Sequence, residues 1–297
     1  AGPAGVVAAL QAANLGAKTT LVAQNEFGGM AANDGPVQIR TLAHAARLIR
    51  DAKQFSKYGI DVGEPKLDFT ALLARVRDVV NDVRAHSAFR LQIDSLGITV
   101  HEQTGNARFV DHHTLETDSG LRVRADKFII CTGGASRRLS VPGSELTATH
   151  SDAWSLTSVP ESILVIGAGA TGAQVASIFN AFGSRIQLFQ SGPRILPTED
   201  EDVSKSVAAA FRESGIVVHE NFGRIDSFEK TRNGVRMRFS KDGKEDSAEA
   251  SLVVVTAGWI ANTEKLNLQV AGVETDSRGF VCVNAHQQTA ASHIYAA

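Results

Sequence analysis

The spacing of hydrophobic positions predicts helices in the first third of the chain and short strands after it. Helices are expected over residues 41–57 and 68–94. Asp68 is suited to cap the second helix, because its carboxylate can accept from free backbone N–H groups of the first turn. Apolar residues of this helix recur at three- and four-residue spacings on one face: Phe69, Leu72, Leu73, Val76, Val79, Val80 and Val83.

From Ile98 onward the pattern changes to short strands, and Asp118, Ser119 and Gly120 predict the turn of a hairpin. A Pro/Gly segment at residues 140–146 is a candidate domain boundary. The residue pattern of the second half predicts a strand, a glycine turn, a helix and a strand, in this order. It continues with a helix and with strands expected at 216–221, 251–259 and 280–297. Both halves begin with a glycine turn that enters a helix, which predicts an α/β fold.

Composition adds little beyond an ordinary globular chain. The 297 residues are 43% apolar and 21% charged, with a formal net charge of −2, so neither a nucleic-acid nor an anionic-membrane partner is indicated. No run of about 18 apolar residues occurs, and no membrane insertion is expected. Cys131 and Cys282 lie in strand-like contexts, where a cysteine is usually a small buried hydrophobe. No metal-ligand spacing is present, so no metal site is predicted.

The clearest motif is Gly167-x-Gly169-x-x-Gly172, which follows the apolar strand Ile163–Ile166 and opens a helix. Strand, glycine turn and helix together predict a dinucleotide site. The first glycine makes the tight turn, the second lets the backbone approach a pyrophosphate, and the third lets helix and strand pack closely. Ala170 and Thr171 lie in the first helical turn, where free N–H groups and the helix dipole favour phosphate.

The residue that reads the ribose is expected at the end of the next strand, and this residue is Gln190. A carboxylate there would accept from the ribose hydroxyls and repel a 2′-phosphate, whereas a neutral amide does less of both. Arg194 is near enough to help bind a 2′-phosphate, although a solvated arginine is equally compatible with the pattern. The sequence therefore does not decide whether the nucleotide is NADH or NADPH.

A second glycine turn is indicated at the start of the chain by Gly2, Pro3, Ala4 and Gly5. After the strand that follows, the position expected to be acidic is Ala23, so one charged acceptor for a ribose is missing. The chain begins inside this turn and ends on an apolar strand, which predicts a fragment of a longer protein.

A third glycine loop, FGGMAANDGPVQIRTL at residues 27–42, connects these motifs to a family. Together with CTGG at 131–134 and TAGWIANTEKL at 256–266, it makes the whole chain resemble the pyridine nucleotide-disulfide oxidoreductases, in the branch of lipoamide dehydrogenase and mercuric reductase. In that family two redox cysteines lie five residues apart in this loop. Here Ala31 and Pro36 occupy their positions, so thiol–disulfide exchange at the loop is excluded by chemistry.

The resemblance implies two Rossmann-like dinucleotide-binding domains, with the NAD(P) domain inserted in the FAD domain. The expected boundaries are 1–148 for the first FAD part, 149–258 for the NAD(P) domain and 259–297 for the return to the FAD domain. The family's C-terminal dimerisation domain, and the Gly-Asp pair that precedes it, are absent from this sequence.

The resemblance also assigns cofactor contacts. FAD is assigned to Gly2, Pro3, Ala4, Gly5, Gly28, Gly29, Met30, Thr132, Gly133 and Gly134, and NAD(P) to Gly167, Gly169, Ala170, Thr171, Gly172, Gln190, Arg194 and Gly258. The family's glutamate in the nicotinamide helix is replaced by Gln174, and Arg40 matches the lysine with which it pairs. Arg40 is therefore expected to face solvent or a phosphate.

Two functions of different classes remain compatible with the sequence. The first is an enzyme, an FAD-dependent NAD(P)H oxidoreductase that delivers electrons to a quinone, dioxygen or a metal ion. The alternative is a non-catalytic nucleotide-binding sensor or scaffold. A third reading, a disulfide or mercuric reductase that uses Cys131 or Cys282, is disfavoured by their strand contexts. A cytoplasmic location, a small-molecule electron acceptor and a homodimer of the full-length protein are expected.

Overall fold

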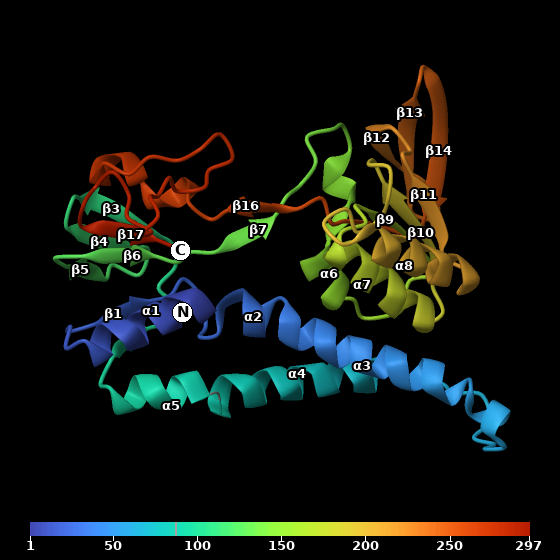
Figure 1. Cartoon of the computed structure of the whole chain (residues 1–297), viewed down its shortest axis with the longest axis horizontal. Coiled ribbons are helices and arrows are strands. Elements are labelled where there is room, and N and C mark those ends of the chain that lie inside the picture. The colour runs from blue at the N-terminus through green and yellow to red at the C-terminus, as the bar shows by residue number, and fades with distance from the viewer. Residues whose placement is uncertain (87) are drawn as a thin grey trace. The chain divides into compact units, whose positions relative to one another are not determined.

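The computed structural model describes residues 1–86 and 88–297, which divide into two compact units (Figure 1). The first unit comprises residues 1–37, 78–135 and 259–297, and the second comprises residues 38–77 and 136–258. The Pro/Gly segment 140–146 lies inside the second unit, and the chain changes unit between Ala135 and Ser136. Residues 38–77 also group with the second unit by packing. Which nucleotide each unit binds is not tested by packing, so the assignment of domains to cofactors stays a prediction.

The second unit is built on a parallel five-stranded sheet in the order β11-β10-β9-β15-β8. If β9, β10, β11 and β15 are numbered 1 to 4, they lie side by side in the order 3-2-1-4, which is the order of a dinucleotide-binding sheet. This order confirms the predicted α/β fold class. The strands are β8 (Ala148–Thr149), β9 (Ser162–Ile166), β10 (Arg185–Gln190), β11 (Val217–Glu220) and β15 (Leu252–Val255).

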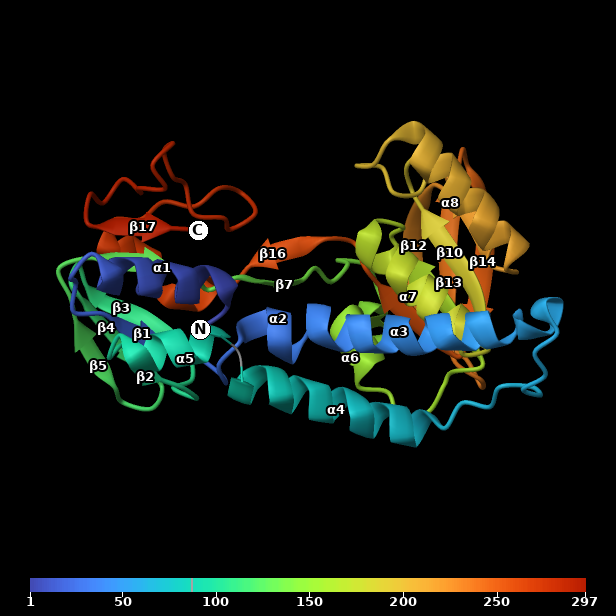
Figure 2. The ribbon, with the colours of Figure 1, turned by 60° about the horizontal axis from the view of Figure 1, so that its bottom comes forward.

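Alternate residues of these strands face two different layers, because successive side chains point to opposite sides of a sheet. Ile163 and Val165 pack in a core with α7 (Ala170–Ala181), whereas Leu164 and Ile166 pack in another core with an antiparallel sheet. That sheet consists of β12 (Arg224–Lys230), β13 (Val235–Lys241) and β14 (Lys244–Ala250). Figure 2 shows α7 beside β10, and α8 (Glu201–Glu213) packs on β11. The sheet is therefore buried on both faces.

The remaining elements of the second unit are short or complete its helical layer. They are η1 (Phe55–Tyr58), η2 (Ser144–Leu146) and α6 (His150–Trp154). Two long helices are shared between the units: α3 (Pro36–Ala52) belongs to the second unit from Gln38 onward, and α4 (Phe69–His86) belongs to it as far as Arg77. Asp68 caps α4 as predicted, accepting from the Ala71 N–H at 2.9 Å. The helix expected over 41–57 instead begins at Pro36, since proline is well suited to the first helical position.

The first unit contains helices α1 (Pro3–Asn14) and α5 (Ala88–Ser95), which lie side by side in Figures 1 and 2. Parallel pairs form between β1 (Thr20–Val22) and β2 (Thr99–His101), and between β6 (Phe128–Ile130) and β17 (Ile294–Ala296). The predicted hairpin is confirmed, because β4 (Thr114–Thr117) pairs antiparallel with β5 (Arg122–Arg124) across the 118–120 turn. The unit also contains α2 (Gly29–Asn33), β3 (Ala107–Asp111), β16 (Trp259–Ala261), η3 (Glu264–Leu266) and η4 (Leu268–Ala271). The last residue of β7 (Gly134–Ser136) already belongs to the second unit.

The helix expected over 68–94 is confirmed on both sides of residue 87, as α4 and α5, while residue 87 itself lies outside the described residues. The prediction for the last segment of the chain was wrong. The strand material expected over 280–297 is mostly turns. Isolated bridges join Thr275 to Val281 and Gln288 to Tyr295, and only β17 is a strand there. Side chains of Asp276 and Asn284 accept from backbone N–H groups in these turns, which competes with strand pairing.

Candidate nucleotide-binding sites

The glycine turn of the second unit connects β9 to α7 at the point where the sheet order reverses. Gly167 has φ +97°, and a Cβ there would lie 2.7 Å from the Thr256 carbonyl oxygen. A Cβ on Gly172 would lie 1.9 Å from the Gly167 carbonyl oxygen. Neither position accepts a side chain, so both glycines are required by the fold of the turn itself.

Gly169 differs from its two neighbours in the motif, because a Cβ added to it meets nothing within 4 Å. Gly169 is the N-cap of α7, and no side chain caps this helix. The first turn, with Ala170 and Thr171, therefore opens onto free space at the positive end of a 12-residue helix. This is the geometry in which backbone N–H groups bind a phosphate.

Thr256, which the sequence analysis did not single out, holds the turn from the neighbouring strand. It follows β15, and its Oγ1 lies 2.6 Å from the Gly167 carbonyl oxygen and 3.0 Å from that of Ile166. Its backbone N–H also donates to Ile166 at 2.8 Å. The sequence signal that could have identified Thr256 is its position directly after a buried strand, because parallel strands end at one edge of the sheet.

Gln190 lies at the carboxyl end of β10, as expected for the residue that reads the ribose. Its Oε1 is nevertheless engaged within the protein, accepting from the Ala168 N–H at 2.9 Å. Gln190 is thus part of the support of the glycine turn. Across the ladder it is the register partner of Glu220 on β11.

Arg194 lies four residues after Gln190, in the segment before α8. Its Nη2 donates to the Pro197 carbonyl at 3.2 Å, while its Nη1 is buried and has no hydrogen-bond partner among the described residues. Gly258, also assigned to NAD(P), has φ +99° with open space beside it, and its carbonyl accepts from the Arg137 N–H. The structure thus brings the 167–172 turn together with Gln190.

Gln174 and Arg40 both have exposed side chains. Exposure of Arg40 agrees with the expectation that it faces solvent when no carboxylate is available to pair with it.

The first unit carries the second candidate turn, at the start of α1. Gly2 is the N-cap, no side chain caps the helix, and Pro3 and Ala4 lie in the first turn. A Cβ on Gly5 would lie 3.3 Å from the Cys131 side chain on the neighbouring strand end, so this glycine allows close packing of helix on strand. Ala23 is buried and offers no side-chain acceptor to a ligand.

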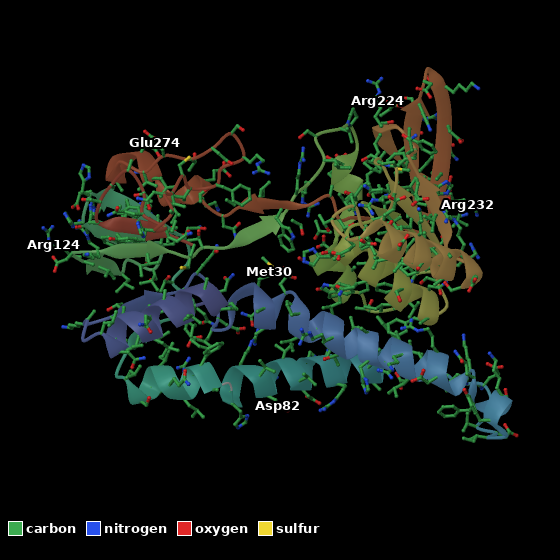
Figure 3. All side chains as sticks on the ribbon, viewed as in Figure 1. Met30, Asp82, Arg124, Arg224, Arg232 and Glu274 are labelled. Carbon is green, nitrogen blue, oxygen red and sulfur yellow. The ribbon has the colours of Figure 1, made fainter. Side chains whose placement is uncertain are left out.

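The glycine loop lies against this turn. The Gly28 N–H donates to the Ala1 carbonyl at 2.9 Å, and a Cβ on Gly29 would lie 2.5 Å from the Cα of Gly2. Both loop glycines have positive φ, +101° and +54°. Met30 follows them in α2, where Figure 3 labels it. The two backbones therefore approach so closely that only glycine fits at position 29.

The two positions that hold redox cysteines in the family that this chain resembles lie in different helices. Ala31 is half-buried within α2, and Pro36 is exposed at the first position of α3. The two cysteines of the chain are both free thiols. Burial raises the pKa of the half-buried Cys131, and Cys282 is exposed.

A charged network that the sequence analysis missed holds the loop in place. The Asn33 side-chain amide donates to the carbonyls of Glu26 and Phe27, and its oxygen accepts from Arg84 Nε at 2.6 Å. Arg84 also pairs with the Glu26 carboxylate. Arg84 comes from α4 and lies 51 residues from Asn33 in the sequence, so no local signal identified this contact.

Glu102 fixes the other side of the same loop. Its Oε2 accepts from the Phe27 N–H at 2.7 Å, and its Oε1 accepts from Arg90 Nη1 at 2.6 Å. Burial acts to raise the pKa of Glu102, but hydrogen bonds from Arg90 and Phe27 and the charge of Arg90 outweigh it and lower the pKa. These side chains line an open groove of about 580 Å³.

Thr132, Gly133 and Gly134 form the third candidate segment of the first unit. Gly133 has φ +68° with open space beside it, and its carbonyl accepts from the Asn262 N–H at 3.0 Å. A Cβ on Gly134 would lie 2.8 Å from the Ile260 carbonyl oxygen. A pocket of about 160 Å³ lies beside Thr132 and Gly133, with Thr263, Phe280 and Gln287 among its lining residues.

The described part of the chain has neither a metal site nor a helix that could span a membrane. Residues 1–86 and 88–297 contain no group of three or more His, Cys, Asp or Glu side chains arranged to hold a metal ion. Within the same ranges, every helix is too short or too polar to cross a lipid bilayer.

Comparison with known proteins gives a consistent result. The family model "Pyridine nucleotide-disulphide oxidoreductase" matches residues 1–297. A dihydrolipoyl dehydrogenase from Zymomonas mobilis is 30% identical over 302 residues, covering 99% of this chain and 64% of the relative. One from Bacillus subtilis is 29% identical and is also covered to 64%. The chain thus spans under two thirds of the length of these relatives.

Among solved structures, the HOCl-induced flavoprotein disulfide reductase RclA from Escherichia coli superposes with a TM-score of 0.83. The two are 24% identical, and the match covers 99% of this chain and 63% of that one. This similarity agrees with the α/β fold described above.

Proposed function

This chain belongs to the pyridine nucleotide-disulphide oxidoreductase family, and we propose that it is an FAD-dependent NAD(P)H oxidoreductase whose electron acceptor is not a disulfide. The predicted cofactors, FAD and NAD(P), are those of this family. The observation that carries the proposal is a contrast between two loops. The 167–172 turn keeps its two obligate glycines and an open phosphate position at Gly169, whereas the 27–42 loop has Ala31 and Pro36 in place of thiols.

The nicotinamide nucleotide is proposed to bind on the second unit. Its pyrophosphate would be held by N–H groups of Gly169, Ala170 and Thr171 at the start of α7, where no side chain competes for them. Thr256 and Gln190 fix the turn through the Gly167 carbonyl and the Ala168 N–H. The ligand site is thus held in shape by contacts that do not depend on the ligand.

FAD is proposed to bind on the first unit, where the residues present fit a dinucleotide. Gly2 leaves the first turn of α1 uncapped for a pyrophosphate, and Gly28 and Gly29 bring the loop backbone beside it. Met30, Thr132, Gly133 and Gly134 are the further proposed contacts. Bound FAD would supply hydride acceptance from NAD(P)H and two-electron release to an acceptor.

The side chains of the 27–42 loop limit which electron acceptors the protein can reduce. Exchange with a disulfide requires a thiolate nucleophile, and neither the Ala31 methyl nor the Pro36 ring provides one. A quinone reduced to a hydroquinone, dioxygen reduced to hydrogen peroxide, or a metal ion reduced to a lower valence each needs electrons but no protein sulfur. The Ala31 side chain is also smaller than a cysteine side chain by one sulfur atom.

The test is the visible spectrum of the purified protein with NADH and NADPH, followed by an acceptor panel of a quinone, dioxygen, ferricyanide and lipoamide. A flavin spectrum that bleaches with nucleotide and recovers with a non-disulfide acceptor is expected, with no turnover of lipoamide. A protein that takes up FAD and nucleotide but is never bleached would favour the non-catalytic sensor or scaffold instead. Lipoamide turnover would contradict the proposed acceptor class.

A matched pair of variants sharpens the test. Gly169→Val fills the open position at the start of α7 without meeting a protein atom within 4 Å of its Cβ, so folding and FAD content should be retained while bleaching is lost. Arg185→Ala is the control, because Arg185 is exposed on the same sheet and its guanidinium pairs with the exposed Glu161 carboxylate.

A further inference from the structure

We propose that Arg84 is a positioning residue for FAD, which acts through Asn33 to hold the turn at Gly28 and Gly29 in one conformation. The inference rests on the proposed function, because FAD is proposed to contact this same turn. Arg84 itself is assigned no contact with FAD, so its effect is expected on the affinity for the cofactor.

The backbone of the turn has little to hold it in one conformation. Gly28 and Gly29 have positive φ values of +101° and +54°, and glycine loses more conformational freedom on folding than any other residue. The helix that follows, α2, has only five residues, and the bond from the Ala32 N–H to the Gly28 carbonyl is long at 3.4 Å. A helix of this length is not stable in isolation. The shape of the turn therefore depends on contacts with other elements of the unit.

Asn33 makes such contacts from the last position of α2. Its Nδ2 donates to the Glu26 carbonyl at 3.2 Å and to the Phe27 carbonyl at 3.3 Å. These carbonyls directly precede Gly28, so the side-chain amide bridges the segment that contains both glycines. The amide thus joins the beginning and the end of segment 26–33.

Arg84 fixes the direction in which the Asn33 amide points. Its Nε donates to Asn33 Oδ1 at 2.6 Å, so the oxygen faces α4 and the NH₂ group faces the two carbonyls. In the opposite orientation donors would face donors and acceptors would face acceptors. Arg84 also pairs with the Glu26 carboxylate, and its side chain is only 29% exposed. This arginine therefore holds segment 26–33 at both ends from one helix.

A second anchor holds the residue before the glycines and does not involve Arg84. The Phe27 N–H donates to Glu102 at 2.7 Å, and the Arg90 guanidinium lies 5.3 Å from the centroid of the Phe27 ring. Phe27 is also buried in a hydrophobic cluster of the first unit. Removal of Arg84 is therefore expected to loosen the Asn33 end of the segment while the unit stays folded.

The shape of the turn matters for FAD because the turn lies against the start of α1. The Gly28 N–H donates to the Ala1 carbonyl at 2.9 Å, and a Cβ on Gly29 would lie 2.5 Å from the Cα of Gly2, the N-cap of α1. A turn that holds this shape for only a fraction of the time raises the apparent Kd by the inverse of that fraction. Loss of one charge-assisted hydrogen bond corresponds to a change of about 10-fold.

Dilution of the FAD-loaded full chain tests the proposal, with the fluorescence of released FAD as the readout. Arg84→Met keeps an unbranched side chain but removes the donors, and it should raise the apparent Kd for FAD about 10-fold. At saturating FAD its rate of reduction by NAD(P)H should equal that of the unchanged protein, because Arg84 acts only on the turn. An unchanged Kd, or a rate that stays below that of the unchanged protein at saturating FAD, would overturn the proposal.

Asn33→Asp is a second variant with almost the same side-chain shape. Its carboxylate keeps an acceptor for Arg84 and adds a charge to that contact, but it has no N–H to donate to the carbonyls of Glu26 and Phe27. FAD should therefore bind about 10-fold more weakly than to the unchanged protein, although the pair with Arg84 is retained. Undiminished FAD affinity would contradict the proposed path from Arg84 through Asn33.

Arg108→Met is the matched control, and Arg84→Lys is the conservative variant. Arg108 belongs to the same unit and pairs with the carboxylates of Glu116 and Asp118, so its loss should leave the Kd for FAD unchanged. Arg84→Lys keeps a charged donor, and it should recover part of the affinity that Arg84→Met loses. An equal loss of affinity in the Arg108 variant would overturn the proposal in favour of a general effect of surface charge.

Failure of this inference is distinguishable from failure of the proposed function. If NAD(P)H bleaches the protein and all variants release FAD equally, the proposed function stands and the inference fails. If NAD(P)H never bleaches the protein, but Arg84→Met and Asn33→Asp release FAD more readily than Arg108→Met, the proposed function fails and the inference stands.

Discussion

The Thr256 hydroxyl lies 2.6 Å from the Gly167 carbonyl oxygen, joining the end of β15 to the glycine turn after β9. The two residues are 89 positions apart in the sequence. The bond closes the turn at the switch point of the sheet, where the nucleotide is proposed to bind.

Replacing Thr256 by valine should therefore impair nucleotide binding more than it impairs folding. Valine keeps the side-chain shape but removes the donor, so stability should fall by about 1 kcal/mol. KM for the nicotinamide nucleotide should rise several-fold with kcat little changed, and Thr256→Ser should restore it. The measurement is steady-state kinetics beside thermal unfolding. A fall in kcat with KM unchanged would contradict a positioning role.

The glycines of the 167–172 turn should differ in what their substitution damages. Gly172→Ala places a Cβ 1.9 Å from the Gly167 carbonyl oxygen and 2.7 Å from Thr256 Oγ1, so overpacking should cost about 1–3 kcal/mol of stability. Gly169→Val should leave the unfolding midpoint unchanged while abolishing nucleotide binding. Thermal unfolding and calorimetry on both variants check this. An equally stable Gly172→Ala protein would contradict the geometry of the turn.

Glu102 should contribute stability that is lost in acid. Its pKa in the folded state is lowered from the model-compound value of 4.5 by its bonds with Arg90 and Phe27, against the opposing effect of burial. The unfolded state therefore binds the proton more readily, and the contribution is present above about pH 4.5 and disappears as pH falls through the lower folded-state pKa. Chemical unfolding from pH 7 to pH 3 should show a smaller acid-dependent loss in Glu102→Gln. An unchanged pH dependence would contradict this assignment.

The two cysteines should be dispensable for electron transfer. Cys282 is exposed, whereas burial raises the pKa of Cys131 and lowers its thiolate fraction, so iodoacetamide should modify Cys282 first. A protein with both Cys131→Ser and Cys282→Ser should keep its NAD(P)H-dependent reduction of a quinone or dioxygen. Mass spectrometry after labelling and activity of the double variant are the measurements. Loss of activity with intact FAD content would contradict this prediction and would support a mechanism that uses a cysteine sulfur.

Much of the fold followed from local patterns. Apolar spacing identified α4 and its Asp68 cap, and the Asp118–Gly120 turn identified the β4–β5 hairpin, because periodicity and turn chemistry act over a few residues. The prediction of strands over 280–297 was wrong, because local hydrogen bonds there favour turns. Its apolar residues resemble strand residues, but Asp276 and Asn284 bind backbone N–H groups that a strand would have paired.

The glycine turns, the family and the absence of sulfur at positions 31 and 36 were predictable before folding was considered, since each depends on residue identity along a short stretch. Three contacts required the folded chain: Gln190 supports the turn through Ala168, Thr256 closes it, and Arg84 holds Asn33. These contacts join residues 22, 89 and 51 positions apart, and they exist because strand order and helix packing bring distant side chains to one place.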